Sequence, residues 1–428
     1  MLNVQLLLTG NELMSGDIVD TNSAYLAQQL KDIGIELHCK TTVGDSLPLL
    51  IEMMQQLSRS ADVLIVNGGL GPTVDDMTAQ ALSDVSARPL TIHPLALEHV
   101  KQWCLKRHYT LTGPNIKQAL LPLDCDLVTN SIGSAPGFKL THNNCLIICT
   151  PGVPSELKTM FADQIKPLLQ TMLPDALNVV TDKMHVFGIG ESGLQKMINE
   201  QLPEWPEQIE LGFRASMPIL EVKVTSRFKQ DDELRQQWGS KLNTLLGQHV
   251  VNHNGDTLGK TLIHALAERN LKVTTAESCT GGLIASLLTQ VPGSSAVFEA
   301  GFVTYSNAMK QQLLDVDAAT LQQCGAVSQA VVEQMLHGAL TVSGADYGVA
   351  VSGIAGPDGG TEDKPVGTVW LAWGSKNDIR AVKLFFPAGR QYFQRYVASA
   401  GLDLLRRMIL GFNDQPRYIS ERQPLSVK

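Results

Sequence analysis

Hydrophobic and polar positions along the first 170 residues predict strands and helices in turn. Short apolar runs indicate buried strands, and the segments between them carry apolar residues every three or four positions, as one face of a helix does. Short apolar strands that alternate with helices are typical of a parallel sheet covered on both faces. The predicted strands are 3–9, 38–43, 61–67 and 144–150, and the predicted helices are 23–33, 48–60 and 78–85.

The pattern changes in the middle of the chain and then returns. Residues 171–253 hold two strand-like and two helix-like segments, which predict a small α+β module. From Leu258 the alternation of strands and helices resumes and predicts a second α/β domain. Its predicted strands are 271–275, 302–305, 347–352 and 366–373, and its main helices are 330–341 and 392–408.

The expected fold class is therefore α/β: two three-layer αβα domains with mostly parallel sheets, joined by the small α+β module. The expected limits are 1–170 for the first domain, 171–253 for the module and 254–412 for the second domain. Residues 413–428 are polar, and we expect them to form a mobile tail.

Composition narrows the class of protein. With 44% hydrophobic and 18% charged residues, the 428-residue chain can bury sizeable cores, and its formal net charge of −8 speaks against broad nucleic-acid binding. No apolar run approaches the roughly 18 residues of a membrane span, and the N-terminus lacks the basic segment of a signal peptide. The seven cysteines are scattered without a CxxC pair, which favours buried, reduced thiols and a cytoplasmic location.

One serine stands where a strand gives way to a helix. The segment 273–285, VTTAESCTGGLIA, places Ser278 between a β-rich run and an apolar helical pattern. Backbone N–H groups at such a point have no intrahelical partner, so the serine has the access and the donors that an acyl-transfer nucleophile needs. An ordinary N-cap serine is the alternative reading, and Cys279 is a rival nucleophile. The residues expected to receive the substrate beside Ser278 are Thr280, Gly281 and Gly282.

A lysine further along the chain offers a base for this serine. Tyr305 and Lys310 follow a predicted strand in the segment FVTYSNAMK. A lysine whose pKa is lowered by burial can act as general base for a serine without a histidine. Taken alone, Lys310 would be an ordinary surface lysine. Together with Ser278 and Tyr305 it forms the expected catalytic group.

Two further features of the second domain suit a phosphorylated ligand. The glycine-rich loop SGIAGPDGG (352–360) follows a predicted strand, and its Gly353 and Gly356 allow a phosphate to approach the backbone. Arg390, after FFPAG, can pair with a phosphate through its planar guanidinium group. We therefore expect these three residues to bind substrate.

Three glycine- and acid-rich loops follow strands in the first domain, at 10–20, 68–76 and 151–156. Ligands of parallel α/β sheets bind beyond the carboxyl ends of the strands, so these loops predict one site for a phosphate and a divalent metal. The alternative for GGLGPTVDD is a strained turn followed by an aspartate that caps a helix. The expected substrate-binding residues are Gly68, Gly69, Gly71, Thr73 and Glu156. The expected metal ligands are Asp75, Asp76, Glu12 and Asp20, with Asp17 nearby.

A glycine pattern in the module needs a separate interpretation. GIGESG (188–193) matches the dinucleotide-binding pattern GxGxxG between a strand and a helix. The module is too small for a dinucleotide-binding domain, so we interpret these glycines as a structural turn. The sequence therefore predicts no Rossmann site here.

Taken together, these motifs resemble the CinA family of competence/damage-inducible proteins over about residues 1–412. The first domain is similar to the molybdopterin-binding-type domain of that family, with GNELMSGDIVDTN, GGLGPTVDD and PGVPSE. The module, with FGIGES, resembles the family's KH-type segment, so we expect a KH-like module. The last domain resembles nicotinamide-nucleotide amidase, with TAESCTGG, GFVTYSN, GAVS, VSGIAGPDGG and KPVGTVW.

The resemblance implies a bifunctional enzyme of pyridine-nucleotide metabolism. Its C-terminal half would hydrolyse nicotinamide mononucleotide (NMN) to nicotinate mononucleotide and ammonia without a cofactor. Ser278 would be the nucleophile, Lys310 the base and Tyr305 a member of the hydrogen-bond network. The N-terminal half would be an ADP-ribose pyrophosphatase that uses a divalent metal, Mg²⁺, Mn²⁺ or Co²⁺. The implied partners are these two small molecules and a second copy of the chain in a homodimer, with no membrane and no nucleic acid.

The segment FFPAGRQYFQR departs from the family, which usually reads FPGDR. Ala388 and Gly389 replace the Gly–Asp pair, so a carboxylate is missing beside Arg390 and the expected role of Arg390 is weakened. The alternative to an enzyme is a non-enzymatic regulator or a molybdopterin-binding protein. The intact set of Ser278, Tyr305 and Lys310 favours the enzyme, because a binding module has no need of it.

Overall fold

The computed structural model describes residues 2–174, 177–253 and 255–422. The chain divides into two compact units, one formed by 1–180 with 226–230 and the other by 181–225 with 231–428. The first unit contains the N-terminal α/β domain. The second contains most of the small module and the C-terminal α/β domain. In the part of the chain that the structure describes, no helix is long and apolar enough to cross a membrane.

The N-terminal domain is built on a six-stranded sheet in the order β2-β1-β3-β8-β7-β6. The first four strands of this order run parallel, and β7 and β6 extend the sheet in antiparallel pairs. The four strands predicted from the sequence are confirmed, while β6 and β7 were not predicted. Strand bounds are β1 Val4–Thr9, β2 Leu37–Val43, β3 Val63–Asn67, β6 Asp126–Val128, β7 Gly137–His142 and β8 Cys145–Thr150, with a separate pair β4 Leu90–Ile92 and β5 Leu120–Pro122.

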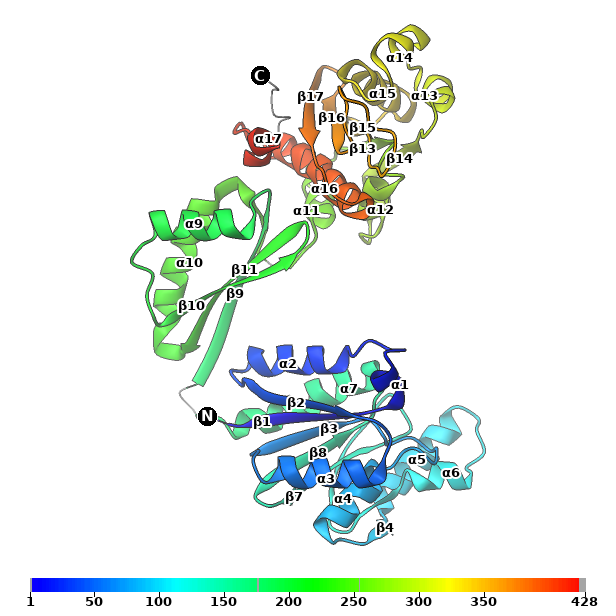
Figure 1. Ribbon diagram of the computed structural model, residues 1–428, viewed down its shortest axis with the longest axis vertical. Coiled ribbons are helices and arrows are strands. Elements are labelled where there is room, and N and C mark those ends of the chain that lie inside the picture. Colours follow the sequence, from blue (N-terminus) through cyan, green and yellow to red (C-terminus); the bar gives the residue numbers. More distant parts are fainter. Residues whose placement is uncertain (1, 175–176, 254, 423–428) are drawn as a thin grey trace. The chain divides into compact units, whose positions relative to one another are not determined.

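Helices cover both faces of this sheet, as the apolar strands predict (Figure 1). Alternate side chains of β1 point to opposite faces, so Leu7 packs in one core and Leu6 and Leu8 pack in the other. The first core includes residues of α3 and α4, and the second includes residues of α2 and α7. Helix bounds are α1 Asn11–Ser15, α2 Asn22–Asp32, α3 Leu47–Ser58, α4 Thr78–Ser86, α5 Pro94–Lys106, α6 Gly113–Lys117, α7 Pro154–Met160 and α8 Lys166–Thr171.

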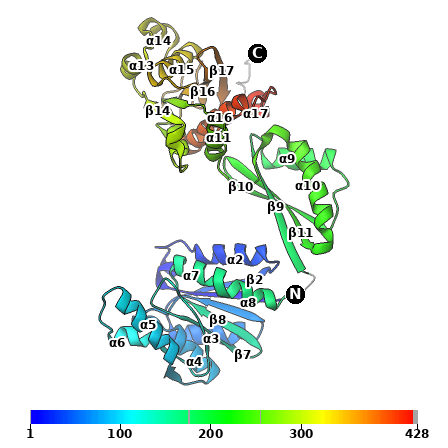
Figure 2. The same ribbon diagram turned by 180° about the vertical axis from the view of Figure 1, so that it is seen from behind.

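The module is a four-stranded sheet in the order β10-β11-β9-β12 with two helices on the same side (Figure 2). Leu194 of α9 and Leu242 of α10 pack with Val222 and Val224 of β11 in its core. Gly188, in the turn between β9 and α9, has a positive φ of 82°, which suits glycine. The turn interpretation of GIGESG is therefore confirmed. Bounds are β9 Leu177–Phe187, α9 Glu191–Gln201, β10 Ile209–Ser216, β11 Ile219–Phe228, α10 Asp232–Leu246 and β12 Val250–Asn252.

The C-terminal domain has a five-stranded sheet in the order β14-β13-β15-β16-β17. β14, β13 and β15 run parallel, whereas β15, β16 and β17 pair antiparallel, and β17 was not predicted. One core lies under α11, α12 and α16, and the other lies under α13, α14 and α15, so this domain also has three layers. Bounds are α11 Leu258–Ala267, β13 Val273–Glu277, α12 Leu283–Thr289, β14 Phe298–Val303, α13 Asn307–Leu314, α14 Ala318–Cys324, α15 Gln329–Ser343, β15 Tyr347–Gly353, β16 Thr368–Ser375, β17 Asp378–Phe385 and α16 Arg390–Ile409.

The segment after α16 is not the mobile tail that its polarity suggests. Residues Arg417–Glu421 form a short helix, α17, whose Tyr418 and Ile419 are buried. The Tyr418 ring packs edge-on against Phe187 of β9, with ring centroids 5.3 Å apart. Two apolar side chains are therefore enough to anchor this segment. Residues 423–428 of the expected tail lie outside the described residues.

A buried charged cluster joins α16 to the module. The fully buried Asp403 accepts hydrogen bonds from Arg406 (2.7 and 3.0 Å), Arg407 (2.9 Å) and the Tyr418 hydroxyl (3.0 Å). Arg406 and Arg407 also donate to the backbone oxygen of Gln248, at 2.8 and 3.2 Å. We call these five residues the Asp403 cluster. Its carboxylate balances one of the two guanidinium charges, and the Gln248 oxygen accepts from both arginines, which lowers the cost of burying them.

Candidate active site

The sheet of the C-terminal domain places Ser278 at the carboxyl ends of its parallel strands. Ser278 directly follows β13, whose last residue, Glu277, pairs with Val303 of β14 on one side and Val351 of β15 on the other. The Ser278 N–H donates to the Val351 oxygen at 3.0 Å, and the Thr304 N–H donates to the Glu277 oxygen at 2.9 Å. The residues that follow β13 and β14 therefore lie side by side at one edge.

The start of α13 brings Lys310 to the same place. The Ser306 hydroxyl caps this helix by accepting a hydrogen bond from the Met309 N–H at 3.2 Å, so Lys310 lies in its first turn. Helical side chains lean toward the N-terminus of their helix, which carries the Lys310 amine back over Thr304. The Lys310 Nζ lies 3.1 Å from the Ser278 Oγ, 2.7 Å from the Thr304 oxygen and 3.4 Å from the Tyr305 oxygen.

Both reacting groups are shielded from water. Lys310 is 1% exposed and Ser278 is 9% exposed, and burial lowers the pKa of the Lys310 amine. A neutral amine has two N–H donors and one lone pair. The two backbone oxygens can take the two donors, which leaves the lone pair for the Ser278 hydroxyl. The structure thus brings Ser278 and Lys310 together, as the sequence predicts, in a geometry that suits a nucleophile and its base.

The turn after Ser278 depends on its two glycines. Gly281 and Gly282 have φ angles of 64° and 96°, a left-handed conformation that other residues adopt only with strain. The N–H of Gly281 is occupied, because it donates to the Ser278 oxygen at 3.1 Å. These glycines therefore determine the shape of the turn. This role is additional to the one expected from the sequence, which is to let the substrate approach closely.

Glu277 is a site residue that the sequence reasoning missed. This fully buried carboxylate accepts hydrogen bonds from four donors of the following turn and helix. A side chain of the protein therefore occupies the first turn of α12, so these N–H groups are not available to an anion of the substrate. The only signal in the sequence was the glutamate directly before the serine in AESCTGG. The donors are the Thr280 Oγ1 (2.7 Å) and the backbone N–H groups of Gly282 (3.0 Å), Ile284 (3.0 Å) and Ala285 (2.8 Å).

Tyr305 is placed with Arg390 rather than with the serine. Its phenol oxygen accepts a hydrogen bond from the Arg390 guanidinium at 3.0 Å, and the same guanidinium donates to the Gly356 oxygen at 2.9 Å. Arg390 is the first residue of α16 and keeps this position with Ala388 and Gly389 before it. The structure thus gathers Tyr305, Arg390 and the loop that begins at Gly353, the last residue of β15.

Cys279 is poorly suited to be the rival nucleophile. Its side chain is buried, and burial raises the pKa of the thiol to about 12, so the reactive thiolate is scarce at neutral pH. All seven cysteines are free, which agrees with the expectation of reduced thiols. The expectation of burial is wrong for Cys39 and Cys324, which are exposed.

In the N-terminal domain the three predicted loops meet at the carboxyl ends of β1, β3 and β8. The Asn22 side chain donates to the Asn67 Oδ1 at 2.9 Å and to the Gly152 oxygen at 2.7 Å. The Asn67 side chain in turn donates to the Pro151 oxygen at 2.6 Å. The adjacency of the loops is therefore confirmed, and asparagine side chains hold them together.

The glycine-rich loop borders a cavity of about 200 Å³. At Gly68, with φ of 111°, a side chain would lie 2.6 Å from the Thr9 oxygen, so only glycine fits. Asp76 accepts hydrogen bonds from the N–H (2.8 Å) and hydroxyl (2.6 Å) of Thr73. Lys117 donates to the backbone oxygens of Thr73 and Asp76 and lines the cavity together with Gly69, Gly71 and Asp76.

The four acids expected to hold a metal do not form a prepared site. Within the described residues, no group of three or more His, Cys, Asp or Glu side chains is placed to bind a metal ion. Asp20 bonds instead to Ser23 and to Lys40, at 3.1 Å from the Lys40 amine. Burial would raise the pKa of Asp20, but these partners outweigh it and lower the pKa. Asp75 and Glu12 are exposed.

Glu156, expected to bind substrate, is half-buried and bonded to the protein itself. Its carboxylate accepts a hydrogen bond from the Asn130 side chain at 2.7 Å, and burial raises its pKa. A side chain at Gly133 would collide with this carboxylate. Glu156 therefore packs against the segment after β6, which the sequence gave no reason to expect.

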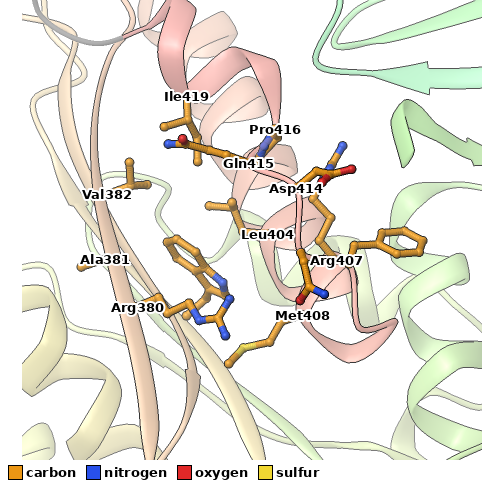
Figure 3. Close-up of a pocket in the computed structure, with 13 residues that line it drawn as sticks. Arg380, Ala381, Val382, Leu404, Arg407, Met408, Asp414, Gln415, Pro416 and Ile419 are labelled. Carbon is orange, nitrogen blue, oxygen red and sulfur yellow. The ribbon is translucent and has the colours of Figure 1, made fainter. Parts of the chain in front are cut away.

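A separate cavity of about 310 Å³ lies in the C-terminal domain (Figure 3). Arg380 and Val382 of β17 border one side, and Leu404, Arg407 and the segment before α17 border the other. None of its lining residues belongs to the group around Ser278, so we do not assign it to the candidate active site.

The fold and the buried serine–lysine pair define a class: α/β proteins whose C-terminal domain carries the groups of a serine hydrolase with a lysine base. Comparison with known proteins then shows the family. The model for the "CinA C-terminal domain" matches residues 255–409, and the model for the "Probable molybdopterin binding domain" matches residues 5–171. A CinA-like protein from Colwellia psychrerythraea is 55% identical over 422 residues, which cover 98% of each chain. The chain belongs to the CinA-like protein family, as its motifs predict.

Two other relatives add detail. The nicotinamide-nucleotide amidohydrolase PncC of Shewanella oneidensis is 39% identical over 410 residues, which cover 96% of each chain. Among solved structures, the competence/damage inducible protein CihA from Agrobacterium tumefaciens is 43% identical and covers 37% of this chain and 94% of its own, with a TM-score of 0.34.

Proposed function

We propose that the C-terminal domain hydrolyses the carboxamide of NMN and releases nicotinate mononucleotide and ammonia. The observation that carries this proposal is the 3.1 Å contact between the Ser278 hydroxyl and the buried Lys310 amine. The name of the Shewanella oneidensis relative, a nicotinamide-nucleotide amidohydrolase, supports the choice of substrate.

In the first step, the Ser278 Oγ attacks the carboxamide carbon while its proton moves to the neutral Lys310 amine. The carbonyl oxygen becomes an oxyanion, which needs hydrogen-bond donors. Within the described residues, no other residue's backbone accepts a hydrogen bond from the N–H groups of Cys279 and Thr280. These two groups adjoin Ser278, and we assign them to the oxyanion.

In the second step, the protonated Lys310 gives its proton to the leaving nitrogen, the carbon–nitrogen bond breaks and ammonia departs. The product is an ester between Ser278 and the nicotinoyl group. A water molecule, deprotonated by Lys310, then cleaves this ester and restores the serine. We place the ribose phosphate of NMN near Arg390 and the loop that starts at Gly353, because Arg390 offers a planar pair of donors there.

Ammonia release from NMN by the full-length protein tests this proposal. Ser278→Ala removes one hydroxyl, so ammonia release should fall to background while the melting temperature stays close to that of the parent. Ser286→Ala is a matched control, because this serine lies on the neighbouring helix α12 and its Oγ accepts a hydrogen bond from the Gln290 amide at 3.2 Å. Near-normal turnover by Ser278→Ala would remove the serine from the mechanism.

We propose a second activity for the N-terminal domain, the metal-dependent hydrolysis of ADP-ribose to AMP and ribose 5-phosphate. The convergence of the three loops and the cavity beside Gly69 and Lys117 support it, because glycines and a lysine suit a diphosphate. The acids do not fit a ready-made metal cage, so we propose that Mg²⁺, Mn²⁺ or Co²⁺ binds together with the substrate's phosphates, as Mg²⁺ commonly does.

Product analysis after incubation with ADP-ribose tests the second activity. AMP should form with a divalent ion and should not form after treatment with EDTA, and added metal should restore it. Absence of AMP with all three metals would leave this domain as a binding domain, in keeping with its molybdopterin-type family model.

A further inference from the structure

Glu277 is a buried carboxylate with an unusual set of partners. It is 0% exposed, and no Lys, Arg or His forms an ion pair with it in the part of the chain that the structure describes. Its Oε2 accepts hydrogen bonds from the Thr280 hydroxyl and from the Gly282 and Ile284 N–H groups, and its Oε1 accepts one from the Ala285 N–H. The negative charge is therefore balanced by hydrogen-bond donors and by the start of α12 alone.

These bonds determine which backbone donors near Ser278 remain free. Four donors of the turn and helix point to Glu277, and the Gly281 N–H bonds to the Ser278 oxygen. A side chain of α16 holds the turn from the other side, because the Gln394 amide donates to the Cys279 oxygen at 2.8 Å. With the Ser278 N–H bound to Val351, only the N–H groups of Cys279 and Thr280 are left unpaired in this turn, among the residues that the structure describes.

We propose that Glu277 is a positioning residue for the nucleophile: it holds the turn 278–282 in the one shape that leaves the Cys279 and Thr280 N–H groups unpaired beside the Ser278 hydroxyl. This proposal rests on the proposed amidase function for its substrate. It assigns Glu277 no proton transfer and no contact with the substrate. Its effect on the reaction passes through the backbone of the turn.

Glu277→Gln is the sharpest perturbation, because it keeps the shape of the side chain. Glutamine has one acceptor oxygen and one NH₂ group. In one orientation its NH₂ group faces the Ala285 N–H, and in the other it faces the three donors that bond to Oε2 in the parent. In both orientations a donor faces a donor. The turn must then move to relieve this conflict. Asp317→Asn is the matched control, because Asp317 caps α14 of the same domain through the Ala319 and Thr320 N–H groups, both at 3.2 Å.

For Glu277→Gln we expect kcat for ammonia release from NMN to fall about 100-fold, the size of effect seen when one oxyanion donor is lost. KM should change by less than about threefold, because the two oxyanion donors bind the transition state more strongly than the ground state. The pH at which kcat/KM reaches half its plateau should stay the same, because the base is unchanged. Asp317→Asn should lower the melting temperature and leave kcat unaltered. An unchanged kcat in Glu277→Gln, or a shifted pH profile, overturns the proposal.

A fluorophosphonate probe separates this proposal from the proposed substrate. The Ser278 Oγ forms a bond to phosphorus, the P–F bond breaks, fluoride leaves and the hydroxyl proton passes to Lys310. If the parent protein reacts at Ser278 but does not release ammonia from NMN, the amidase assignment fails and the role of Glu277 is judged by labelling alone. Labelling at least tenfold slower in Glu277→Gln then supports the role, and equal labelling rates refute it. A parent protein that neither labels nor hydrolyses NMN refutes both proposals.

Discussion

Replacement of Lys310 by arginine tests the catalytic pair most directly. The guanidinium keeps a positive charge and hydrogen-bond donors for the Thr304 and Tyr305 oxygens, which accept from the lysine at 2.7 and 3.4 Å. It cannot lose its proton at any accessible pH, so it cannot take the proton of Ser278. Lys310→Arg therefore removes the base and keeps the charge.

The magnitude follows from the protonation of lysine. An ordinary lysine is neutral in roughly one molecule in 2,500 at pH 7, which is equivalent to about 4.6 kcal/mol. Burial lowers the pKa of Lys310, and each unit of lowering makes the neutral form about ten times more abundant. The loss of a general base costs about 10²- to 10⁴-fold in rate, and we expect Lys310→Arg to lose at least 100-fold in kcat.

The assay is ammonia release from NMN as a function of pH. In the parent protein kcat/KM should rise with pH along one limb whose midpoint lies below 10.5, the value of an unperturbed lysine. This limb should be absent from any residual activity of Lys310→Arg. A midpoint at or above 10.5, or a variant within about threefold of the parent, would refute the reasoning about the base.

The pH dependence of the melting temperature should also show the titration of Lys310. Because the folded protein lowers the pKa of Lys310, the unfolded chain binds this proton more tightly, and protonation destabilises the fold. The penalty is complete below the folded pKa and decreases as the pH rises from that value toward 10.5. The melting temperature of the parent, measured relative to Lys310→Met, should therefore rise across this window. A difference that does not change with pH would contradict the lowered pKa.

Three further predictions use other parts of the molecule. Cys279→Ala should retain ammonia release, because the buried thiol has a raised pKa and is not the nucleophile; loss of activity in a folded variant would reopen its role. Asp75→Ala/Asp76→Ala should lose AMP formation from ADP-ribose and keep ammonia release, while the loss of the bonds from Thr73 costs about 1 kcal/mol; hydrolysis that persists would make this loop purely structural. Phe187→Ala should destabilise the second unit by about 3–5 kcal/mol, since this side chain is 1% exposed in its core, and calorimetry should show the transition of the first unit unmoved.

Sequence periodicity predicted the elements that are apolar and regular. The strands before Gly10, Gly68 and Pro151 are mostly apolar, and their fixed order in a parallel sheet brings the loops after them together. β17 was missed because DIRAVKLF, at the edge of the sheet, mixes charged and apolar residues. α17 was missed because its two buried side chains stand in a polar segment.

The sequence predicted which residues form the candidate site, but it predicted only some of the hydrogen bonds among them. The motif AESCTGG predicted Ser278 at the end of a strand, whereas α13, which brings Lys310 within reach of the serine, was not predicted. The sequence could not show that Glu277 turns back to bind the start of α12, because that depends on the left-handed turn at Gly281. Spacing likewise could not show that Asp20 bonds to its own neighbour Ser23 rather than to a metal.

The Asp403 cluster bears on how this part of the protein can change over generations. Loss of Asp403 leaves both guanidinium groups buried without a counter-charge, at a cost of about 3–5 kcal/mol, which is a large part of the stability of a typical domain. Single substitutions at Asp403 should therefore be eliminated, whereas joint replacement of Asp403, Arg406 and Arg407 by apolar residues can be tolerated. Gln248 of the module accepts from both arginines. Substitutions on the two sides of this contact should therefore be coupled, so the module and the C-terminal domain should evolve as one unit.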